Sequence, residues 1–135
     1  MKKKRWWILF LLMLLAAALI WGGLALYNGM FPVAAPLCCP EAEEVTAVYL
    51  NGKDGAPVVE EILQAIASAE PTRLWSINDF PAAEEYHTVS LITAEREYRY
   101  YLYQEDSRAY LESPYEGVYA IDAQLLTMVA GYVAE

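Results

Sequence analysis

An unbroken apolar segment near the N-terminus constrains this chain more than any other feature. Residues 2–5 are four consecutive cations, and residues 6–27 that follow contain no charged side chain. As a helix this segment rises about 33 Å, which matches a hydrocarbon core about 30 Å thick. Aromatic residues stand at both of its ends, and the flanking cations lie on one side. The sequence therefore predicts a single transmembrane helix at 6–27 behind a cytoplasmic basic tail at 1–5.

Two other arrangements compete with this signal-anchor. A cleaved signal peptide has an apolar region of about 7–15 residues that ends in small residues. Residues 16–18 are three alanines, but the apolar run continues beyond them, and a later small-residue site is followed by Pro36. A lipoprotein would use Cys38 or Cys39, yet Leu37 directly precedes Cys38, where a small residue is expected. An uncleaved anchor fits better than a lipoprotein or a secreted form.

Charge is divided sharply along the chain. All eighteen acidic residues follow Pro40, together with five of the nine basic ones, so the part beyond the span carries a net charge of −13. Such a surface repels phosphate backbones, which argues against nucleic acid as a partner. It favours an envelope protein, a membrane protein, a cationic peptide or a divalent cation. The same carboxylates could instead serve only to keep a small domain soluble.

Three prolines interrupt residues 28–44, which predicts an extended stalk between the span and a folded domain at 45–135. Cys38 and Cys39 both lie in this stalk. A disulfide between neighbouring residues would be strained, so the alternatives are an intermolecular bridge, which would give a disulfide-linked dimer, or two free thiols.

The domain alternates between strand and helix patterns. A β-branched strand at 45–50 ends at the turn signal Asn51-Gly52, and a helix follows Pro57. Three polar-separated strands come next, at 88–93, 96–103 and 108–112. Asp122 then suits the N-cap of a last helix, whose predicted inward residues are Leu125, Leu126, Val129 and Val133. This order predicts a two-layer α+β domain, in which both helices cover one face of a mostly antiparallel sheet. The other face is left to solvent or to a partner.

Two segments resemble a known family. The first runs from Tyr110 to Tyr119 and contains the pattern Glu-x-Pro-Tyr-x-Gly-Val-Tyr, and the second comprises Thr72-Arg73, Ser76 to Asp79 and Pro81. Both are similar to segments of small exported, membrane-anchored domains of unknown function from Gram-positive bacteria. The resemblance covers about Val45 to Val133 and implies no activity.

Catalytic chemistry is not evident in the residue pattern. His87 is the only histidine, and both cysteines precede the predicted domain, so a nitrogen and sulfur zinc site cannot be assembled within it. A catalytic triad would need the same histidine, and no nucleophile-elbow sequence presents a serine. Neighbouring carboxylates such as Glu60-Glu61 read as solvated charge. We therefore expect a protein that is not an enzyme and has no cofactor or metal.

Candidate binding residues come from the aromatic side chains. Trp75, Phe80 and Tyr86 lie in a connection that is longer than compact domains usually have, so they either pack over an edge of the core or form a binding loop. Tyr115 and Tyr119 flank a Pro-to-Gly turn that could border a pocket or be purely structural.

The layout favours an extracytoplasmic interaction module, held at the cell membrane and contacting its partner through the domain. A regulatory accessory subunit is the alternative, in which the span itself makes the contact. Gly22-Gly23 and the alanines at 16–18 would permit close helix approach in that case.

Overall fold

The computed structural model describes residues 2–132, which divide into two compact units at Pro32 and Val33. The first unit is the single helix α1 (Lys2–Met30), which extends three residues beyond the predicted span. It is long and apolar enough to cross a membrane, and a signal sequence near an N-terminus would meet the same description.

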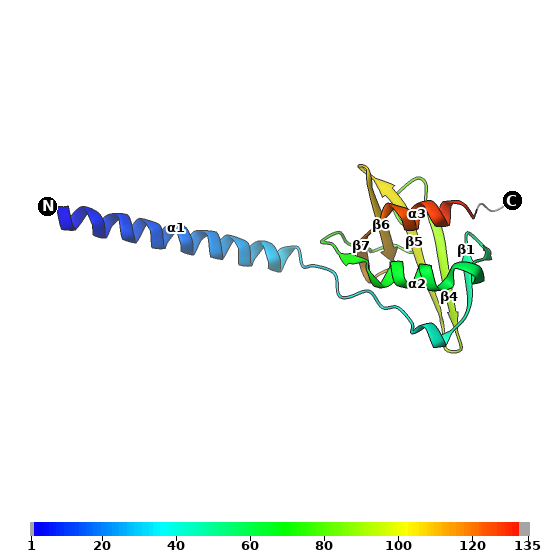
Figure 1. Ribbon diagram of the computed structural model, residues 1–135. Helices are drawn as coiled ribbons and strands as arrows, with labels where there is room; N and C mark the ends of the chain where they lie inside the picture. Colours follow the sequence, from blue (N-terminus) through cyan, green and yellow to red (C-terminus); the bar gives the residue numbers. More distant parts are fainter. Residues whose placement is uncertain (1, 133–135) are drawn as a thin grey trace. The chain divides into compact units, whose positions relative to one another are not determined.

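The second unit contains a seven-stranded sheet and two helices (Figure 1). Its elements in chain order are η1 (Ala42–Glu44), β1 (Val45–Leu50), β2 (Lys53–Asp54), η2 (Ala56–Val58), α2 (Val59–Ala67), β3 (Glu70–Pro71), β4 (His87–Thr93), β5 (Glu97–Glu105), β6 (Arg108–Ser113), β7 (Gly117–Ile121) and α3 (Ala123–Ala130). The strand order is β2-β1-β4-β5-β6-β7-β3, and each neighbouring pair is antiparallel. The predicted α+β class is confirmed.

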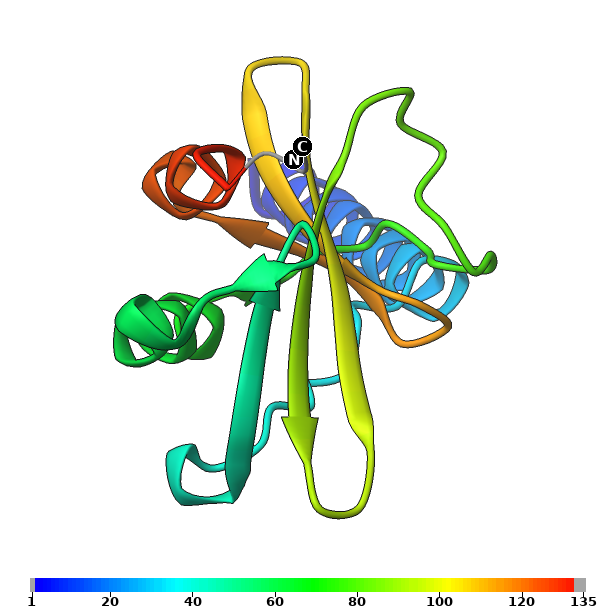
Figure 2. The same ribbon diagram turned by 90° about the vertical axis from the view of Figure 1, so that its right-hand side faces the viewer.

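Both helices of this unit cover the same face of the sheet (Figure 2). Their apolar stripes fall on the residues that the 3.6-residue period predicts, and the Asp122 carboxylate accepts a hydrogen bond from the Gln124 amide at 2.8 Å as the expected N-cap. Val133 lies outside the described residues. The fully buried side chains of this layer are Val48, Leu50, Ile62, Ile66, Val89, Leu91, Tyr100, Leu102, Leu111, Tyr119, Leu125 and Val129.

The meander has one strand more than the sequence predicts. The turn at 114–117 forms as expected, with the Glu116 amide donating to the Ser113 carbonyl at 3.0 Å, but it leads into β7 and not directly to the last helix. Val118 and Tyr119 are both buried, on opposite faces of the sheet. A short strand covered on both faces has no apolar and polar alternation, which is why the period did not indicate it.

Residues 33–40, predicted to be part of a free stalk, lie instead along the helix-covered face of the core, and we call them the N-terminal strap. The Tyr100 hydroxyl donates to the Cys38 carbonyl at 2.6 Å, and the Tyr119 hydroxyl donates to the Ala35 carbonyl at 2.7 Å. Partly buried side chains of the strap pack on the same core. Proline favours extended backbone, and here that extended backbone is docked on the domain.

The Asn51-Gly52 turn joins the sheet to the last helix. Both residues have positive φ, 50° and 81°, as a two-residue hairpin requires. The Asn51 amide nitrogen donates to the carbonyls of Val129 at 3.1 Å and Tyr132 at 2.7 Å, at the end of α3. Its oxygen accepts from the Thr88 amide at 2.9 Å. One side chain therefore ties the β1–β2 hairpin to β4 and to the C-terminus of α3.

Candidate functional site

The long connection between β3 and β4, residues 72–86, crosses the face of the sheet that the helices leave uncovered (Figure 2). It is anchored at its start, where the Thr72 hydroxyl donates to the Val118 carbonyl at 2.7 Å. Tyr101, Tyr103 and Val118 are consequently buried on this face. The sequence predicted a face left to solvent or to a partner; the loop covers part of it, while residues towards both ends of β5, such as Arg99 and Glu105, are exposed.

Three hydrogen bonds join the middle of this loop to the β6–β7 hairpin. The Ser76 hydroxyl donates to Glu112 Oε1 at 2.7 Å and accepts from the Tyr115 amide at 3.2 Å. The Tyr115 hydroxyl donates to Asp79 Oδ1 at 2.7 Å, and this bond raises the pKa of the phenol. The two segments singled out by their resemblance to a family thus contact each other directly.

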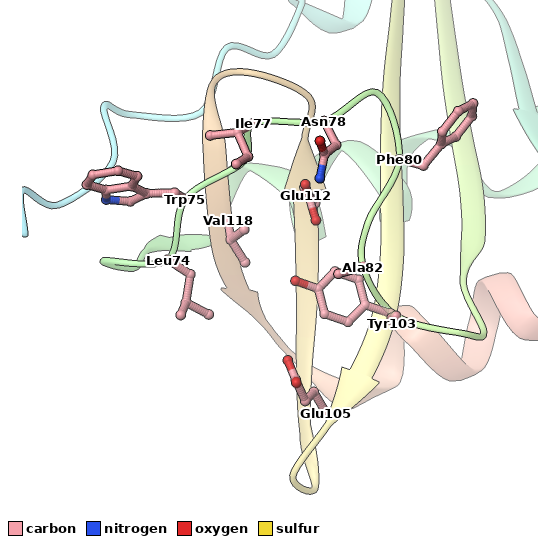
Figure 3. A pocket seen from close by; sticks show the side chains of 11 residues that line it. Leu74, Trp75, Ile77, Asn78, Phe80, Ala82, Tyr103, Glu105, Glu112 and Val118 are labelled. Atoms are coloured by element: carbon pink, nitrogen blue, oxygen red, sulfur yellow. The ribbon is translucent and has the colours of Figure 1, made fainter.

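A cleft of about 250 Å³ lies beneath the loop (Figure 3). The loop forms one wall, and side chains of β5, β6 and β7 form the other. The lining residues are Leu74, Trp75, Ile77, Asn78, Phe80, Ala82, Ala83, Tyr103, Glu105, Glu112 and Val118. The loop side is therefore mostly apolar and includes the amide of Asn78, whereas the sheet side contributes Val118, two carboxylates and a phenol.

Glu112 is the principal charged group of the cleft, since it lies near the end of β6 and is only 6% exposed. Its Oε1 atom accepts the Ser76 hydroxyl, and within residues 2–132 no buried side-chain oxygen or nitrogen is left without a hydrogen-bond partner. Burial raises the pKa of the Tyr103 phenol well above its ordinary value, and the nearby charges of Glu112 and Glu105 raise it further. The cleft therefore has a negative electrostatic potential.

The outer surface of the loop is unusually apolar. Trp75, Ile77 and Phe80 are 64%, 68% and 58% exposed, and Leu74 is 46% exposed. We call these four side chains the loop surface. Single exposed apolar residues are common, but four within seven positions are an unusual concentration, and exposed apolar side chains gathered in this way mark interaction sites.

The predicted binding residues divide into three groups. Trp75 and Phe80 line the cleft, as a binding loop requires. Tyr86 lies outside the lining and packs edge-on against Tyr101, with ring centroids 5.3 Å apart. Tyr115 holds the loop through Asp79 and does not line the cleft either.

Two further predictions fall on the opposite side of the sheet. Tyr119 belongs to the helix-covered core and cannot border the cleft, because adjacent strand residues face opposite ways and its neighbour Val118 faces the loop. Cys38 and Cys39 lie in the strap, the first exposed and the second half-buried, and they form no disulfide with each other. Burial raises the pKa of the Cys39 thiol.

Sequence reasoning missed the polar residues of the cleft, above all Glu112, Glu105 and Tyr103. In the structure Glu112 pairs with Tyr101 across β5 and β6, so it shares the loop-covered face. Recognising it as buried would have required knowing that the loop folds back. Among residues 2–132 no three His, Cys, Asp or Glu side chains gather as metal ligands would.

The fold and cleft define a small, acidic α+β domain that follows an apolar helix. Residues 35–120 match the family model DUF5301, described as a domain of unknown function (DUF5300), and the chain belongs to this family. The chain is also similar to the NMR structure of the protein from Ruminococcus gnavus, with 31% identity and a TM-score of 0.53, over 64% of this chain and 92% of that one. No curated protein matches the chain.

Proposed function

We propose that this protein is a single-pass, membrane-anchored binding module that captures a partner protein or peptide through the loop surface. The observation that carries the proposal is the exposure of Leu74, Trp75, Ile77 and Phe80 on a loop that is itself held in place by Thr72, Ser76 and Asp79. A preorganised apolar surface binds with little loss of conformational freedom. Large aromatic side chains at its centre are the residue types that dominate binding energy at interfaces.

The location is part of the proposal. Four cations precede the apolar helix, and the next one along the chain is Lys53, so the positive-inside rule puts the domain outside the cytoplasm. The resemblance to exported domains of Gram-positive bacteria supports an envelope setting. A net charge of −13 beyond the span favours a partner with a basic surface. Binding, and not catalysis, is the activity that this arrangement supports.

Photocrosslinking in native membranes tests the loop surface. A photoreactive residue at position 77, which is 68% exposed, is introduced into the full chain, and captured proteins are identified by mass spectrometry. We expect Trp75→Ala and Phe80→Ala each to lower capture at least ten-fold, which is about 1.4 kcal/mol and typical of an aromatic contact at an interface. Tyr49→Ala is the matched control, because Tyr49 is an exposed aromatic on β1 outside the loop. Equal capture by all three variants would refute the proposal.

The location has its own test, which uses the two native cysteines. Cys38 is exposed in the strap beyond the helix, so a membrane-impermeant maleimide should label it in intact cells after mild reduction. Labelling that appears only after lysis would place the domain in the cytoplasm. Release of the labelled protein into the medium, with loss of mass equal to the N-terminal segment, would show a cleaved signal peptide in place of the anchor.

A further inference from the structure

We infer that the cleft beneath the loop binds a cationic group carried on an alkyl chain, as in the arginine or lysine side chain of a partner protein. This inference rests on the proposed function, because the same loop forms both the loop surface and one wall of the cleft. It adds the chemical class of the group that the partner inserts. The argument depends on the carboxylates, on the size of the cleft and on its apolar wall.

The buried carboxylate of Glu112 provides the first argument. The residue is only 6% exposed, and its Oε1 atom accepts the Ser76 hydroxyl at 2.7 Å. A carboxylate this shielded from water is stabilised most by a charged donor, because a hydrogen bond to a charged group is about twice as strong as one between neutral groups. Because Glu112 lines the cleft, a cationic group in the cleft can reach its carboxylate.

A second carboxylate strengthens the negative potential of the cleft. Glu105 lies at the end of β5 and lines the cleft together with Glu112. The charges of both residues raise the pKa of the Tyr103 phenol, which lines the cleft as well (Figure 3). None of the residues that line the cleft is Lys or Arg. The chain has no Lys or Arg between Arg73 and Arg96, whereas this stretch includes three acidic residues of the loop. A cationic ligand would therefore meet no like charge among the residues that line the cleft.

Size and wall chemistry favour a single side chain. The cleft of about 250 Å³ would hold roughly eight water molecules at ~30 Å³ each, and it is smaller than the ~300–1,000 Å³ typical of drug-sized ligands. Its apolar lining includes Ile77 and Phe80 from the loop and Val118 from β7. Such a wall suits the methylene stem of arginine or lysine, and the Trp75 and Phe80 rings could also receive a cation on their faces.

Other charged ligands fit less well. A phosphate or a carboxylate would face Glu112 and Glu105 with no cation among the lining residues to receive it. Calcium takes about six to eight oxygen ligands, and no three acidic, His or Cys side chains gather as metal ligands would in the described part of the chain. An organic cation needs only the hydrogen-bond acceptors and the apolar wall that the cleft provides.

The test uses two small probes that differ in charge and hardly in shape, n-butylguanidinium and n-butylurea. Each is titrated into the full chain, reconstituted in nanodiscs and methyl-labelled for NMR. We expect n-butylguanidinium to shift the methyl signals of Leu74, Ile77 and Val118, and to bind at least ten-fold more tightly than n-butylurea. Equal affinities, or shifts confined to helix-layer methyls such as those of Ile62, would overturn the inference.

Charge-neutral variants assign the effect to the cleft. Glu112→Gln keeps an oxygen for the Ser76 hydroxyl but removes the charge, so we expect it to abolish the preference for n-butylguanidinium. Glu95→Gln is the control: it changes the net charge by the same amount, but Glu95 lies in the turn that precedes β5, at the opposite end of this strand from Glu105. We expect it to change the affinity for n-butylguanidinium less than two-fold. Glu105 is exposed, so Glu105→Gln leaves the core untouched, and we expect it to weaken binding at least three-fold. Equal weakening by all three would show nonspecific attraction and refute a cleft site.

The two proposals fail separately. If n-butylguanidinium shows no preference over n-butylurea but partner capture still depends on Trp75, only the cationic inference is wrong. If the guanidinium binds as expected but capture is unchanged in Trp75→Ala, the loop surface is not the docking site.

Discussion

Replacing Asn51 with glycine should destabilise the domain without disturbing the turn that Asn51 occupies. Glycine accepts a φ of 50° readily, so the backbone is preserved, while the amide contacts to Val129, Tyr132 and Thr88 are lost. At about 1 kcal/mol net per hydrogen bond, three lost contacts amount to roughly 2–4 kcal/mol. With an m-value near 2 kcal/mol/M, the urea midpoint should fall by about 1–2 M.

Pulse proteolysis of the full chain in nanodiscs measures this midpoint, since only the unfolded domain is cleaved. Asn51→Asp is the informative companion, because it keeps the acceptor for Thr88 but removes the donors and puts a negative charge beside the C-terminal carbonyls of α3. It should be at least as destabilising at pH 7 and should recover partly below about pH 4, where the carboxylate becomes protonated. A midpoint that is unchanged in both variants would refute the role given to this amide.

Three further outcomes follow from the strap. Gly117→Ala should cost about 1–3 kcal/mol, because its new Cβ would lie 2.6 Å from the Ala34 Cβ, and adding Ala34→Gly should restore part of the loss of thermal stability. Tyr100→Phe should cost about 1 kcal/mol at pH 7 through its lost hydrogen bond to the Cys38 carbonyl. Burial raises the pKa of the Tyr100 phenol, so its contribution to the free energy of unfolding is kept below about pH 10 and lost as the pH rises further. Above about pH 10 the free energy of unfolding of the wild type should therefore fall by about 1.4 kcal/mol per pH unit more than that of Tyr100→Phe. Iodoacetamide at pH 8 should modify Cys38 about ten-fold faster than half-buried Cys39, whose pKa is raised, and equal rates by mass spectrometry would contradict the docked strap.

Regular elements of the fold were predictable because each has a local cause. The period of apolar residues located α2, the Asp122 cap located α3, and Asn51-Gly52 located the first hairpin. Strand β7 had no such cause, since it is buried on both faces and shows no alternation. The docking of the strap was not predicted for a related reason: proline indicates an extended backbone but not which residues that backbone contacts.

The candidate site was half predictable. Loop length and large apolar side chains pointed to Trp75 and Phe80, which do line the cleft. Glu112 looked like one more solvated carboxylate, because its burial depends on a loop that is 36 residues away at Ser76 and on the pairing of β5 with β6. Contacts of that range are set by tertiary structure, and no local pattern in one sequence carries them.

The strap also bears on how the domain folds. Its contact between Ala35 and Tyr119 joins residues 84 apart in the sequence, and the contact between Asn51 and Tyr132 joins residues 81 apart. Contacts of such long range slow folding, since the chain must lose the entropy of closing a large loop before these contacts can form and stabilise it. The first residues of the domain to be synthesised therefore cannot form these contacts until the last residues have been synthesised. We expect chains that end before β7 to remain without a stable native state, so folding is completed only after nearly all of the domain has left the ribosome.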